Sequence, residues 1–68
     1  MSLSERQMRL VEYLGDQGSA VMKDLKSVLS MVSEDTVLRD LTDLIKKGII
    51  RKEGATKSAR YVIANAAN

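Results

Sequence analysis

The side chains best suited to chemistry lie in one segment, Val32 to Lys47, which combines hydroxyl, acidic and basic groups. Hydroxyls can bond to bases or phosphates, an arginine can donate two hydrogen bonds to guanine, and a carboxylate can accept one from cytosine. The candidate contacts in this segment are Ser33, Asp35, Thr36, Leu38, Arg39, Thr42 and Lys46. These side chains are therefore candidates for contact with nucleic acid.

The same residues also have structural interpretations. Ser33 can cap a helix, Thr36 can bond back to Ser33, and the acids can stabilise a helix N-terminus. Arg39 can form an ion pair with Asp35, Asp40 or Asp43, the last of which lies four residues further along the helix. Residues 33–47 hold four acidic and three basic side chains, a balance that repels phosphates.

Leu38 lies off the apolar stripe of this segment, on the side that we expect to be exposed. It can touch a thymine methyl group. It can equally mark a protein interface, or be one of the isolated surface apolar residues that need no explanation.

A second group of candidates follows Gly48, where residues 49–63 contain four basic side chains and the single acid Glu53. A glycine-bearing linker between two β-prone runs predicts a hairpin. A basic hairpin tip can reach phosphates or a narrow minor groove. The alternative is a solvated hairpin whose charges protect an edge strand from aggregation. The candidate contacts here are Arg51, Lys52, Thr56, Lys57 and Arg60.

These candidates need elements to position them, and the sequence supplies clear signals. Ser4 and Gln7 have capping-box spacing, and Gly18 is suited to end a helix. Val37, Leu41, Leu44 and Ile45 form one apolar stripe at helical spacing. The patterns predict helices over residues 4–17, 22–30 and 34–47, and extended segments over 19–21, 49–53 and 59–63. We expect one domain over residues 1–63 and a flexible tail over 64–68.

This order predicts a small α+β winged helix-turn-helix with three helices and a two-stranded wing.

The chain has 68 residues, a net charge of +2, and neither cysteine nor histidine. The usual nucleophile pairs and thiolate metal sites therefore cannot form. We expect no catalytic residues, no metal and no cofactor. No apolar run approaches the length of about 20 residues that spans a membrane, and we expect a cytoplasmic protein.

The segments VSEDTVLRDL and TDLIKKGII resemble the helix-turn-helix of DeoR-type transcriptional regulators. That motif reads V-S-x-x-T-[IV]-x-R-D-L and continues to K-G-[IL]-[IL]. The matching residues are Val32, Ser33, Thr36, Val37, Arg39, Asp40, Leu41, Lys47, Gly48, Ile49 and Ile50. The segment RKEGATKSARYVI is similar to a basic wing ending in S-x-R-Y-x-[IL], also found in winged-helix domains appended to Fic-type proteins. The resemblance covers residues 3–63.

The resemblance implies double-stranded DNA binding by a transcriptional regulator or its DNA-binding module. Residues 33–47 would enter the major groove, and residues 51–60 would contact the flanking backbone. DeoR-type regulators usually carry a second arginine where this chain has Leu38, so one expected contact is missing. The alternative is a protein-interaction or regulatory winged helix without direct DNA contact. A larger parent protein or a homodimer would suit either function.

Overall fold

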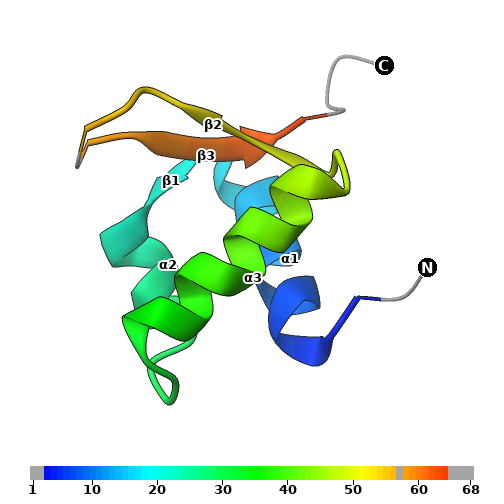
Figure 1. Cartoon of the computed structure of the whole chain (residues 1–68), viewed down its shortest axis with the longest axis vertical. Helices are drawn as coiled ribbons and strands as arrows, with labels where there is room; N and C mark the ends of the chain where they lie inside the picture. The colour runs from blue at the N-terminus through cyan, green and yellow to red at the C-terminus, as the bar shows by residue number, and fades with distance from the viewer. Residues whose placement is uncertain (1–2, 57, 65–68) are drawn as a thin grey trace.

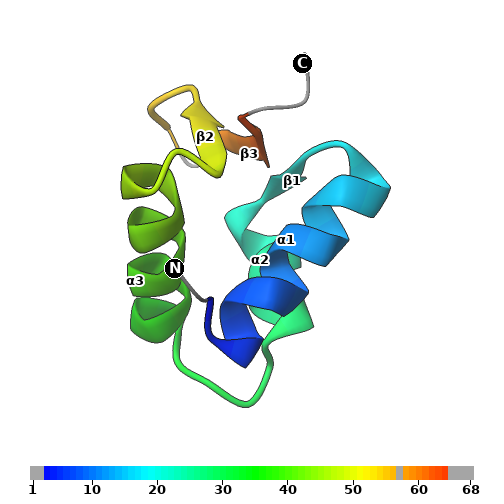
Figure 2. The same cartoon turned by 90° about the vertical axis from the view of Figure 1, so that its right-hand side faces the viewer.

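The computed structural model describes residues 3–56 and 58–64. The elements are α1 (Glu5–Gln17), β1 (Ala20–Val21), α2 (Met22–Val28), α3 (Glu34–Lys46), β2 (Ile50–Glu53) and β3 (Arg60–Ile63). The predicted order of elements is confirmed. The strands form an antiparallel sheet in the order β1-β3-β2, and Figures 1 and 2 show it across one end of the three helices. The fold is a winged helix.

The first helix spans Glu5–Gln17, one residue shorter than the predicted 4–17, and its caps Ser4 and Gly18 are the residues that the sequence predicts. The Ser4 Oγ accepts a hydrogen bond from the Gln7 N–H at 3.1 Å, and the Gln7 Oε1 accepts one from the Ser4 N–H at 3.2 Å. This reciprocal pair is the capping box. Gly18 ends the helix with a φ of 86°, in the left-handed region that favours glycine.

The second helix is two residues shorter than predicted, because it ends at Val28. Leu29 leaves the helical conformation, with φ −115° and ψ 55°, while its N–H still donates to the Leu25 carbonyl at 3.3 Å. The Leu29 side chain is buried in the core. Packing of Leu29 therefore takes precedence over continuing the helix.

Aliphatic side chains from all three helices and the sheet form the core. Val37, Leu41 and Leu44 are fully buried, which confirms the phase predicted for α3. Ile45, predicted in the same stripe, is 38% exposed and lies at its edge. The largest fully buried side chains among the described residues are Leu10, Leu14, Leu25, Val37, Leu41, Leu44 and Ile50.

The sheet closes the core opposite the connection between α2 and α3. Tyr61 and Ala20 are opposite each other on β3 and β1, and both are buried. Burial raises the pKa of the Tyr61 phenol. Of the predicted tail, Ala64 donates its N–H to the Ile49 carbonyl at 3.0 Å, and residues 65–68 lie outside the described residues.

Candidate nucleic-acid interface

Five of the predicted contact residues lie together on the side of α3 that faces away from the core. Their side chains follow three turns of the helix and border one shallow hollow, with Asp43 at its margin. We call this surface the outward face of α3. Its residues are Asp35, Leu38, Arg39, Thr42 and Lys46.

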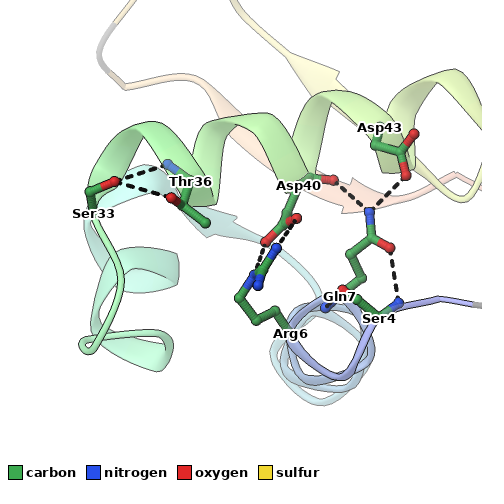
Figure 3. A network of polar contacts seen from close by, with 7 residues as sticks. All are labelled: Ser4, Arg6, Gln7, Ser33, Thr36, Asp40 and Asp43. Atoms are coloured by element: carbon green, nitrogen blue, oxygen red, sulfur yellow. Dashed lines mark hydrogen bonds and ion pairs between the residues drawn. The ribbon is translucent and has the colours of Figure 1, made fainter.

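The hydroxyl groups of this region are engaged in bonds within α3 and its cap. The Ser33 Oγ accepts from the Thr36 N–H at 3.3 Å and lies 3.1 Å from the Thr36 Oγ1 (Figure 3). The Thr42 hydroxyl donates to the Leu38 carbonyl at 2.9 Å. Ser33 and Thr36 thus form the predicted helix cap.

Two of the four acids of α3 contact α1 (Figure 3). Asp40 is 8% exposed and accepts from the Arg6 guanidinium at 2.7 and 3.2 Å. This hydrogen bond and the charge of Asp40 raise the pKa of Arg6. The Gln7 amide donates to the Asp43 Oδ2 at 2.8 Å and to the Asp40 carbonyl at 3.3 Å.

Asp43 also forms an ion pair with Lys47 at 2.8 Å. The bond from Lys47, followed by that from Gln7, lowers the pKa of the Asp43 carboxyl. In the described part of the chain no ion pair joins Arg39 to Asp35, Asp40 or Asp43, so none of the three possible pairs is present. Residues 33–47 hold four acids and three bases. Because Asp40 and Asp43 are bonded to other side chains, this count overstates the negative charge of the outward face.

A groove beside the outward face separates α2 and the start of α3 from the β2–β3 hairpin. Figure 1 shows the hairpin extending on the side where α2 lies. Lys23 and Lys26 line the groove from α2, and Lys52 lines it from β2. We call it the α2–wing groove. Its lining residues are Met22, Lys23, Lys26, Ser27, Glu34, Leu38, Lys52, Thr56, Ala59 and Tyr61.

The hairpin divides its basic residues between two faces. Lys52 is opposite Tyr61 in the register, and its Nζ lies 6.0 Å from the centroid of the Tyr61 ring, inside the groove. Arg51 points to the other face, because successive strand residues alternate. It borders a hollow with Gly15 and Gly18 of the α1 end and donates to Glu53 at 3.1 Å.

Arg60 lies on the same outer side of the sheet, where its guanidinium donates to the Ser19 Oγ at 3.2 Å. Thr56 lies at the described part of the tip. Its hydroxyl is 2.8 Å from the Ser58 hydroxyl, and its carbonyl accepts from the Ala59 N–H at 2.9 Å. The predicted contact Lys57 lies outside the described residues.

The structure thus brings Lys52 and Thr56 to the same side of the molecule as the outward face of α3, and it separates Arg51 and Arg60 from that side. Reasoning from sequence missed Lys23 and Lys26, because only the tertiary fold places α2 opposite the hairpin. For Lys52, the sequence did contain a signal for the face on which it lies. Side chains alternate along a strand, so Lys52 shares a face of β2 with the buried Ile50.

Within residues 3–56 and 58–64, no group of three or more acidic, histidine or cysteine side chains could hold a metal ion. None of the described helices is long and apolar enough to span a membrane. The polar groups of the candidate interface are suited to contacts with charged surfaces and base edges.

A family model described as a DeoR-like helix-turn-helix domain matches residues 6–60. No curated protein matches the sequence. Among solved structures, the neutron crystal structure of dissimilatory sulfite reductase D (DsrD) is similar, with a TM-score of 0.81 and 15% identity, over 97% of this chain and 100% of that one. Stf76 from the Sulfolobus islandicus plasmid-virus pSSVx is similar with a TM-score of 0.76 and 17% identity, over 91% of this chain and 84% of that one. At these identities, the two structures support the fold alone.

Proposed function

The chain belongs to the DeoR-like helix-turn-helix family, and we propose from this that it binds double-stranded DNA as a transcriptional regulator or as the DNA-binding module of one. In helix-turn-helix proteins the second helix of the motif enters the major groove. Here that helix is α3, and its outward face would meet the base edges. The proposal assigns the chain a binding role and no catalytic one. Such a role would be carried out in the cytoplasm or nucleoid, where the DNA lies.

The observation that carries this proposal is the continuity of two surfaces. The outward face of α3 and the α2–wing groove both include Leu38, so they form one continuous surface. Lys23, Lys26 and Lys52 line the groove on either side. A duplex docked on α3 would bring its phosphates to these lysines, and each neutralised phosphate releases counterions.

Contacts by the wing are part of the same proposal. Lys52 and Thr56 face the groove and would meet the backbone next to the bound segment. Lys57 follows Thr56 in the chain and extends the basic character of the hairpin. Arg51 and Arg60 would reach only DNA that bends around the outer side of the sheet.

The test is the salt dependence of binding to a random-sequence duplex, measured by fluorescence anisotropy. Lys23→Gln and Lys26→Gln should each weaken binding and reduce the slope of log K against log salt by roughly 0.9, the value for one lost phosphate contact. Arg9→Gln is the matched control, because Arg9 is exposed on α1 and lines neither surface. It removes one positive charge and should leave the slope unchanged.

Absence of binding to any duplex at low salt would contradict the proposal. An equal loss of slope in Arg9→Gln and Lys26→Gln would also contradict it, because the attraction would then follow net charge and not this surface. Melting curves of all variants serve as the folding control.

A second candidate function is a protein-interaction or regulatory winged helix. The specific observation that favours it is Leu38, an aliphatic side chain 44% exposed in the middle of the candidate interface. A partner protein, a larger parent chain or a second copy would then cover α3. Leu38→Ala would in that case abolish the complex with little dependence on salt, whereas a DNA complex weakens steeply as salt rises.

A further inference from the structure

Leu38 occupies a distinctive place, because among the described residues it alone lines both the outward face of α3 and the α2–wing groove. Arg39 and Lys46 lie on one side of it, and the lysines of α2 and β2 lie on the other. Charged side chains therefore surround this exposed aliphatic group. They are five cations (Lys23, Lys26, Arg39, Lys46, Lys52) and three acids (Glu34, Asp35, Asp43), which leaves an excess of two positive charges. The centre of a protein–protein interface is depleted of charged residues, so these surroundings fit a polyanion better than an apolar protein surface.

The hydrogen-bond pattern limits which residues of α3 can distinguish bases. The hydroxyls of Ser33 and Thr36 are bonded to each other, and the Thr42 hydroxyl donates to the helix backbone. Asp40 and Asp43 are bonded to groups of α1 and to Lys47. On the outward face, the described side chains that make no hydrogen bond or ion pair within the molecule are Asp35, Leu38, Arg39 and Lys46, while the Thr42 hydroxyl keeps only its acceptor lone pairs.

We propose that Leu38 is a specificity-determining residue that contacts the C5-methyl group of a thymine in the major groove; this inference rests on the proposed function. The thymine methyl is the apolar feature that distinguishes an A·T pair in that groove. Leu38 cannot form hydrogen bonds, so its contribution is burial of methyl surface. The sequence bound by this chain would therefore contain a thymine at the position that α3 presents to Leu38.

The test removes that methyl group from the DNA. Duplexes bound by the wild-type chain are first selected from a random library. Each thymine of a selected site is then replaced singly by deoxyuridine, which lacks the methyl group and keeps the base pairing. One replacement should weaken wild-type binding about fourfold, the effect of one buried methyl group. The Leu38→Ala variant should bind the thymine site more weakly and show no loss at that replacement.

Met8→Ala is the matched control, because Met8 is an apolar side chain of similar exposure that lies on α1 outside both surfaces. It should retain the affinity and the sensitivity to deoxyuridine. Leu38 is not part of the core, so Leu38→Ala should melt like the wild type. A deoxyuridine scan in which the wild type tolerates every replacement would overturn the proposal even without the variant.

Wild-type binding that is insensitive to deoxyuridine at every thymine overturns the role of Leu38 and leaves DNA binding intact. A loss that persists in Leu38→Ala also overturns it, because another residue would then contact the methyl group. Failure of the wild type to bind any duplex overturns the proposed function, and the role of Leu38 with it.

Discussion

Asp40 and Asp43 hold α3 against α1 through side chains of Arg6 and Gln7. The ion pair of Asp43 with Lys47 illustrates how local context selects a partner. Asp43 has a basic residue four positions before it, Arg39, and another four positions after it. The order in which the acid precedes the base is the more favourable one on a helix. The spacing alone allowed both pairs, and the structure contains the one in the more favourable order.

The lowered pKa of Asp43 makes stability depend on pH in a defined direction. A carboxyl whose pKa is lower in the folded chain adds stability that is fully present above its unfolded pKa and is lost as the pH falls through the folded pKa. We expect the wild type to be more stable than Asp43→Asn near neutral pH. The difference should shrink below about pH 4. Urea unfolding of both proteins near neutral pH and at about pH 3 measures it, and a difference that does not change with pH would contradict the assignment.

At the scale of the elements, α3 is the helix that the sequence predicts best. Its cap at Ser33 and its buried Val37, Leu41 and Leu44 follow from residue types and spacing. The end of α2 was not predictable in the same way, because Leu29 continues the apolar pattern of the helix while packing in a non-helical conformation. Whether Leu29 continues the helix depends on the position of the other helices, which the local sequence does not give.

Substitutions on the buried and the exposed side of α3 should have different effects on stability. Leu41 is fully buried, and Leu41→Ala should lower the free energy of unfolding by about 2–5 kcal/mol, because it removes packed methyl groups and leaves a cavity. Leu41→Asp should prevent folding, since it buries an unpaired charge. Leu38→Ala should change stability by no more than about 0.5 kcal/mol, as expected for an exposed site. Urea denaturation compares them, and a well-folded Leu41→Asp protein would show that the helix phase is wrong.

At the scale of the whole molecule, the fold assembles a basic surface from segments far apart in the sequence. Lys23 and Lys26 come from α2, Lys52 comes from β2, and α3 connects them (Figure 1). The sequence predicted the outward face of α3 because one helix carries it. It could not predict the groove, because the groove exists only once α2 and the hairpin face each other.

The most direct test of DNA binding by this surface is the set of backbone amides whose NMR signals move when a duplex is added to the isotope-labelled chain. Binding through the outward face of α3 and the α2–wing groove should produce shifts along residues 35–46 of α3 and at Lys23, Lys26 and Lys52, and little change at Gly15, Gly18 and Arg51 on the outer side. Shifts confined to α1 or to the outer side of the sheet would contradict it, as would a spectrum that the duplex leaves unchanged at low salt.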